Sequence, residues 1–105
     1  MKITLFIEAD GSVDANHLVV NFKNFAAAYE VKTSIISVEK YWKIEQMYEA
    51  LLNIEETSEG NVPKLLNHIA SNWMELPHNI LASRTMDHCQ IFVPYLYMIN
   101  VFRGE

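Results

Sequence analysis

The sequence contains very few of the residues that cross-link, bend or interrupt a small protein. Of its 105 residues, one is cysteine, three are glycine and three are proline. Cys89 has no second cysteine to pair with, so an internal disulfide is excluded and the fold does not depend on an oxidising compartment. Gly11, Gly60 and Gly104 lie far apart, which excludes a glycine-rich loop of the kind that holds phosphate groups. We therefore expect a cytoplasmic protein without a nucleotide-binding loop.

Long apolar runs and positive charge are also scarce. The longest apolar candidate, residues 91–102, is interrupted by Pro94 and Asn100 and stays below the roughly 18 residues that suggest a membrane span. Lysine and arginine number 8 against 13 aspartates and glutamates, which gives a formal net charge of −5. A protein that grips the phosphate backbone needs a basic surface. We expect neither a membrane segment nor a nucleic-acid partner.

Motifs for catalysis or metal binding are missing as well. The histidines are spread along the chain with no pair at helical spacing: His17, His68, His78 and His88. The consecutive Asp87, His88 and Cys89 do not make a triad by themselves, because neighbours on a strand point to opposite faces. Glu8 and Asp10 are the one carboxylate pair placed for acid–base work, which also requires an apolar pocket around one carboxyl. We expect no catalytic residue, no metal site and no cofactor.

What the chain does contain is enough apolar surface for one core. Half of its residues are hydrophobic and one fifth are charged, a balance far from that of disordered chains. A chain of this length buries roughly 60–70% of its unfolded surface when it folds. The composition predicts a single α+β domain over residues 1–105.

Hydrophobic periodicity predicts the elements of the first forty residues. In residues 2–9 every second residue is aliphatic, and all but Phe6 of the residues between them are polar, as in a strand with one buried face. From Asp14, a candidate N-cap, Leu18, Phe22, Phe25 and Tyr29 recur at helical spacing. Residues 32–39 predict a second strand, parallel to the first if a helical crossover joins the two in one sheet.

In the rest of the chain, the pattern predicts two helices and then two strands. A helix is predicted over residues 41–56, and its buried side would consist of Ile44, Met47, Tyr48, Leu51 and Ile54. Pro63 lies in the first turn of the next helix, which ends before Pro77. Residues 79–86 and 90–102 predict strands around a turn at Asp87 and His88, with Pro94 at a bulge or a sheet edge. The predicted order is β-α-β-α-α-β-β, with helices packed on a four-stranded mixed sheet.

Negative charge is concentrated between Glu39 and Glu59, where six carboxylates accompany two lysines. At helical spacing, Glu45, Glu49, Asn53 and Glu56 would line one face of the predicted helix, with Trp42 one turn before Glu45. Such a face is either a solvated surface that keeps the protein soluble, or a docking face that steers a basic partner and uses Trp42 or Tyr41 as an aromatic anchor. The candidate partner-binding residues are Trp42, Glu45, Glu49, Glu56 and Glu59.

In size, acidity and lack of a catalytic motif, the whole chain resembles the small bacterial immunity proteins of contact-dependent growth inhibition. The resemblance is one of character and assigns no site residues. It implies an antitoxin that inhibits a basic nuclease toxin by presenting carboxylates in place of nucleic-acid phosphates. Such a protein needs no catalytic residue of its own, and we expect it to be a monomer when free.

A second interpretation is a small dimeric ferredoxin-like protein that binds a ligand or acts as an enzyme, with its site between sheet and helices. The acidic segment is then plain solvent surface, and the residues that would converge inside a cavity are Arg84, His78 and Tyr95. The quaternary structure and the lining of any cavity distinguish the two interpretations.

Overall fold

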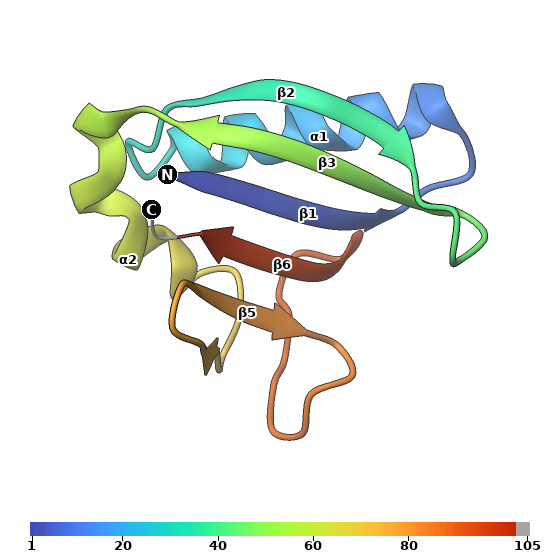
Figure 1. The fold of residues 1–105 in the computed structure, drawn as a ribbon. Helices are drawn as coiled ribbons and strands as arrows, with labels where there is room; N and C mark the ends of the chain where they lie inside the picture. The colour runs from blue at the N-terminus through green and yellow to red at the C-terminus, as the bar shows by residue number, and fades with distance from the viewer. Residues whose placement is uncertain (103–105) are drawn as a thin grey trace.

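One sheet of six strands forms the framework of the protein. The computed structural model describes residues 1–102, and its strands follow the order β2-β3-β1-β6-β5-β4 with every neighbouring pair antiparallel (Figure 1). Along the chain the elements are β1 (Lys2–Glu8), α1 (Ser12–Ala27), β2 (Thr33–Lys40), β3 (Met47–Ile54), the short 3-10 helix η1 (Glu56–Asn61), α2 (Val62–Leu66), β4 (Met74–Glu75), β5 (Asn79–Ser83) and β6 (Leu96–Phe102). The class is α+β, but the predicted four-stranded mixed sheet and its element order are wrong.

The first three elements form where the periodicity predicts them. In β1, Ile3, Leu5 and Ile7 are fully buried, because alternate strand residues point to the same side of the sheet. The buried residues of α1 recur every three or four positions: Ala15, Val19, Phe22 and Ala26. The N-cap of α1 is Gly11, whereas Asp14, the predicted cap, lies in the first turn. The predicted strand, helix and strand are confirmed.

The strands β1 and β2 run in the same direction but are not neighbours. Strand β3 lies between them and pairs antiparallel with both, so the parallel direction that we predicted for two strands of one sheet is confirmed, but no hydrogen bonds join the two described strands directly. The order β2-β3-β1-β6, with α1 and α2 in the connections, is the split β-α-β arrangement of ferredoxin-like proteins. Strands β5 and β4 extend the sheet beyond β6.

The predicted helix over residues 41–56 is also wrong. Residues 41–46 form the turn of a hairpin, and the residues after them form β3. Ala50, Leu52 and Ile54 are buried with the period of a strand. Alanine, leucine and glutamate favour a helix locally, but pairing with β1 and β2 satisfies the backbone groups on both edges of this segment. Pairing with distant strands therefore decides the structure of this segment.

The helix predicted from Pro63 to Leu76 ends at Leu66. Beyond it, the Phe92 N–H donates to the Ile69 carbonyl over 2.8 Å, so this segment pairs with a later one and does not wind further. The two predicted C-terminal strands are shorter than expected, because a loop over residues 84–95 separates β5 from β6. This loop contains Pro94 and the turn at His88, whose φ is 59°.

Two side chains hold the loop over residues 84–95 in place. The Arg84 guanidinium donates to the carbonyls of Val93, Pro94 and Leu96 over 2.9, 3.0 and 2.8 Å. The Tyr95 hydroxyl donates to the Asn21 side chain of α1 over 2.7 Å. The loop thereby joins α1 and α2 in the layer that covers one side of the sheet.

Within residues 1–102, no helix is both long and apolar enough to cross a membrane.

Substitution of Phe22 tests how strongly α1 holds the sheet. Phe22 is 0% exposed, and its truncation leaves a cavity, so we expect Phe22→Ala to lower the free energy of unfolding by about 3–5 kcal/mol. The matched control is Phe92→Ala, because Phe92 is 47% exposed and its loss should cost under about 1 kcal/mol. Urea unfolding followed by circular dichroism measures both. Equal losses would contradict this assignment of the core.

Substitution of Tyr95 tests the attachment of the loop. Burial raises the pKa of the Tyr95 phenol from 10.0 to about 12. The folded state therefore holds the phenol proton more tightly than the unfolded chain does. The resulting contribution to the free energy of unfolding is complete below pH 10 and is lost as the pH rises towards 12. We expect Tyr95→Phe to flatten the fall in unfolding free energy across that window, as measured by urea unfolding at a series of pH values, with Tyr97→Phe as control. A wild-type profile in Tyr95→Phe would contradict the burial of this hydroxyl.

Candidate functional site

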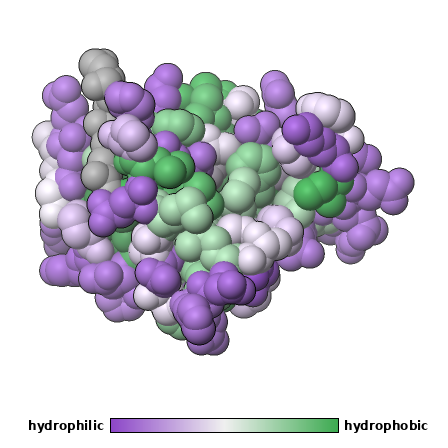
Figure 2. Space-filling model, turned by 60° about the horizontal axis from the view of Figure 1, so that its bottom comes forward, coloured by the Kyte–Doolittle hydropathy of each residue, from purple (hydrophilic) through white to green (hydrophobic). Residues whose placement is uncertain are grey.

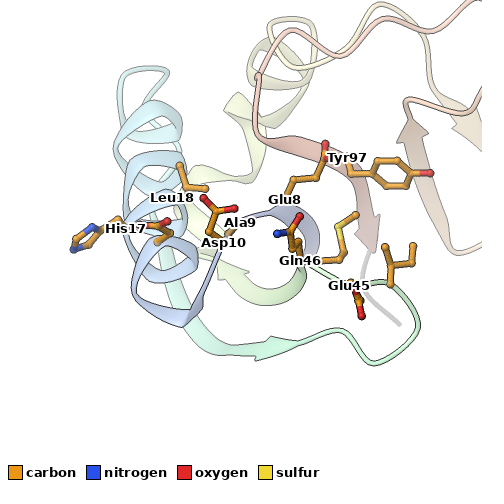
Figure 3. Close-up of a pocket in the computed structure, with 11 residues that line it drawn as sticks. Glu8, Ala9, Asp10, His17, Leu18, Glu45, Gln46 and Tyr97 are labelled. Carbon is orange, nitrogen blue, oxygen red and sulfur yellow. The ribbon is translucent and has the colours of Figure 1, made fainter.

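A cleft of about 610 Å³ opens where β1 leads into α1 and where the β2–β3 hairpin turns back (Figure 3). Figure 3 shows Asp10 and His17 on the α1 side of this cleft and Glu45 on the hairpin side. Glu8, at the end of β1, and Tyr97 of β6 belong to the lining as well. Four chain segments therefore meet in this cleft.

Backbone hydrogen bonds fix the two sides of the cleft to each other. The Ala9 N–H donates to the Gln46 carbonyl over 3.0 Å, which ties the end of β1 to the hairpin. The Tyr41 N–H donates to the Met47 carbonyl over 2.8 Å and closes the hairpin turn. Gln46 itself adopts a left-handed conformation with φ of 57°, which reverses the chain at this point. The lining side chains are thus placed by the sheet and its turn.

The lining carries negative charge without any internal compensation. It contains four carboxylates, those of Glu8, Asp10, Asp14 and Glu45, and no lysine or arginine. Within residues 1–102, none of these four forms an ion pair or a side-chain hydrogen bond. Asp14 is additionally favoured by the positive end of the α1 dipole. A cleft lined by one sign of charge concentrates its field and attracts cationic groups.

The hairpin tip beside the cleft exposes apolar surface. Trp42 is 81% exposed, and the Lys43 ammonium lies 5.1 Å from the centroid of its ring. Ile44, which lines the cleft, is 42% exposed. Tryptophan is enriched at the energetic centres of protein interfaces. An exposed tryptophan and exposed carboxylates thus lie at the same end of the sheet.

The structure divides the predicted partner-binding residues between two ends of the sheet. Trp42 and Glu45 lie in the hairpin at the cleft, but Glu56 and Glu59 lie in η1, beyond the other end of β3. Eight strand residues separate these groups by about 25 Å. Glu59 is occupied there by an ion pair with the N-terminal ammonium over 3.2 Å. The predicted acidic helical stripe therefore does not exist.

Glu49 lies apart from both groups, half-buried in the middle of β3. It faces Glu39 of β2 directly across the strand pair and Phe6 of β1 on its other edge. The Phe6 ring packs edge-on against Tyr41, with centroids 5.1 Å apart. Like charges directly opposite each other destabilise a strand pair. Glu49 thus places a negative charge on the face of the sheet, away from the cleft.

The sequence predicts some of the residues that line the cleft but not how they come together. Glu8 and Asp10 were predicted as a pair, and both line the cleft, but Asp14 was interpreted only as a helix cap. The spacing of these three around the β1–α1 turn is a local signal that could have grouped them. Glu45 reaches the cleft only because residues 41–46 form a hairpin turn. The sequence pattern of this segment predicts a helix instead.

The residues of the second interpretation do not share a cavity with the acidic lining. Arg84 and Tyr95 are engaged in holding the loop over residues 84–95, and His78 is exposed next to β5. Within residues 1–102, no three histidine, cysteine or acidic side chains are grouped closely enough to hold a metal ion. Comparison of the chain with protein-family models, with curated proteins and with solved structures finds no match.

The facing glutamates of β2 and β3 give a stability prediction. Because Glu39 and Glu49 repel each other across the strand pair, we expect Glu39→Lys to raise the free energy of unfolding by roughly 0.2–1 kcal/mol. Glu55→Lys, an equal charge change at an exposed position outside the strands, is the matched control and should have a smaller effect. Urea unfolding at low and high salt measures both, and the gain should shrink with added salt. A loss of stability in Glu39→Lys would show that another group already neutralises the pair.

Proposed function

We propose that this chain is a binding protein that neutralises a basic protein partner, most concretely an immunity protein that inhibits a nuclease toxin. The observation that carries the proposal is the acidic cleft: four uncompensated carboxylates around an opening of about 610 Å³. A nuclease must present lysine and arginine side chains to hold nucleic acid. Those side chains are the chemical complement of this lining.

The arrangement of the carboxylates favours a protein over a single small cation. The four come from the end of β1, the turn after it, the first turn of α1 and the hairpin, so they surround the opening on several sides. Several basic side chains of one partner can enter together, and complementary charges across an interface favour the correct partner and speed its association. Trp42, with its exposed ring, supplies the apolar anchor next to the charge.

The uncompensated charge also supports an inhibitor on kinetic grounds. A protein that must capture a toxin before it acts benefits from long-range steering, which raises association rates steeply at low salt. No group of the chain has to be withdrawn from these carboxylates before a partner binds, because none pairs with them within residues 1–102. The ferredoxin-like strand order supports the second interpretation only at the level of fold, which does not carry a function by itself.

Charge reversal in the cleft tests the proposal. We expect Glu8→Lys combined with Glu45→Lys to abolish capture of a basic partner, because both sides of the cleft then repel its lysines and arginines. The matched control is Glu55→Lys combined with Glu56→Lys, the same charge change at exposed residues at the other end of β3. Tagged wild type, cleft variant and control serve as baits for lysate of the native host at low and high salt, with mass spectrometry of the eluates.

The captured protein is then produced separately and assayed for cleavage of RNA and DNA, with and without each of the three chains. The proposal expects a basic nuclease that wild type and control inhibit and that the cleft variant leaves active. Equal capture by all three baits, or a captured protein without nuclease activity, would contradict it. Circular dichroism and urea unfolding confirm that the cleft variant is folded.

A further inference from the structure

The face of the sheet opposite α1 and α2 carries apolar side chains that are not fully buried: Phe6, Leu51, Leu81, Met98 and Phe102. Alternation along β1 directs Ile3, Leu5 and Ile7 into the core and Lys2, Thr4 and Phe6 to the opposite face, here called the open face. Figure 1 shows α1 behind the sheet. Figure 2, turned towards the side of β5 and β6, shows apolar side chains gathered in the middle of the visible surface with hydrophilic ones around them.

The strand registers arrange the open face in three rows. The middle row joins Leu51, Thr4, Asn100 and Leu81 across β3, β1, β6 and β5. The row on the cleft side joins Glu49, Phe6 and Met98, and the row on the other side joins Asn53, Lys2 and Phe102. The Asn79 amide donates to the Asn100 side-chain oxygen, so these polar groups satisfy each other on the face. Phe102 remains 38% exposed.

We propose that the open face is the interface of a homodimer, formed by a second copy of this chain. In this dimer the two open faces lie against each other, and the two-fold axis runs between them, parallel to the middle row. Each residue of the middle row then faces the same residue of the other copy, so Leu51 and Leu81 meet Leu51 and Leu81 of the partner subunit. The axis exchanges the two outer rows. Phe102 of one copy then lies over Met98 of the partner subunit, which adds an apolar contact on both sides of the middle row. The proposal departs from the monomer that we expected from the sequence.

Charge complementarity identifies the occupant as a second copy. The exchange of rows brings Lys2 over Phe6 of the partner subunit, one strand away from Glu49 of the partner subunit. Because facing sheets pack about 10 Å apart, the backbones of Lys2 and of Glu49 of the partner subunit would be about 11 Å apart. A lysine and a glutamate side chain that extend towards each other span that distance together. Each interface contains this pair twice, because a two-fold contact is isologous. Within the chain, Glu49 faces the like charge of Glu39 and forms no ion pair in residues 1–102. The second copy supplies the missing cation.

The dimer leaves the acidic cleft free. Trp42, Glu45 and the α1 side of the cleft lie in the turn regions beyond the ends of the strands, outside the three rows. A dimer would therefore present two clefts. The proposal goes beyond the function proposed above, and its test needs no partner protein. Because a dimer is then common to both interpretations, the lining of the cleft is what distinguishes them.

A charge exchange tests the interface. Sedimentation equilibrium of the purified chain over a range of concentrations is compared for wild type, Lys2→Glu, Glu49→Lys and the double exchange of both. We expect wild type to dimerise, each single variant to dimerise at least about tenfold more weakly because two attractive pairs become repulsive, and the double exchange to recover. The matched controls, Lys64→Glu and Glu55→Lys, carry the same charge changes outside the open face and should dimerise like wild type.

Mixing the two single variants gives a second readout, because their opposite substitutions should form a heterodimer that neither forms alone. A wild-type chain that stays monomeric, or single variants that dimerise as well as wild type, would overturn the proposal. A double exchange that stays monomeric while folded, as judged by circular dichroism, would also overturn it.

Discussion

The pairing of β3 with strands on both of its edges is the constraint on which the rest of the structure depends. Its backbone groups are used by β1 on one side and β2 on the other, so it occupies the position between them. That position separates β1 from β2 and turns residues 41–46 into the tip of a hairpin. The Ala9 to Gln46 hydrogen bond then closes this tip against the end of β1. The acidic cleft exists because these two turns meet.

The cleft carries a feature that folding alone does not favour. Glu8, Asp10, Asp14 and Glu45 repel one another and have no internal cation within residues 1–102. Natural proteins tolerate such local instability where function uses it, because selection removes only changes that lower stability below what function requires. Here a fully buried core compensates: Phe22 of α1, Leu5 of β1 and Ile99 of β6 are 0% exposed. The apolar layer thus permits an acidic surface that a partner can use.

The two proposed surfaces would bind their partners through different physical interactions. The cleft and the exposed Trp42 combine steering by charge with one apolar anchor, which suits rapid capture of a basic protein. The open face combines apolar side chains, such as Leu51 and Leu81, with a single repeated charge pair, which suits a symmetric contact. They lie on separate parts of the sheet. A dimeric inhibitor with two clefts would combine both kinds of interaction in one molecule.

The sequence by itself determined the acidic character, the absence of an internal disulfide and the strand, helix and strand over residues 2–40, because composition and periodicity act locally. It also placed Glu8 and Asp10 together, since both adjoin one turn. Only the tertiary structure decided that Met47 to Ile54 is a strand, because that segment fits a helical and an alternating pattern, and strand edges far away in sequence settle the choice. The same pairing moved Glu45 to the cleft and left Glu56 and Glu59 at the other end of the sheet. Local periodicity carries no information about which strand edges remain open for pairing, so the assembly of the site was decided by long-range contacts.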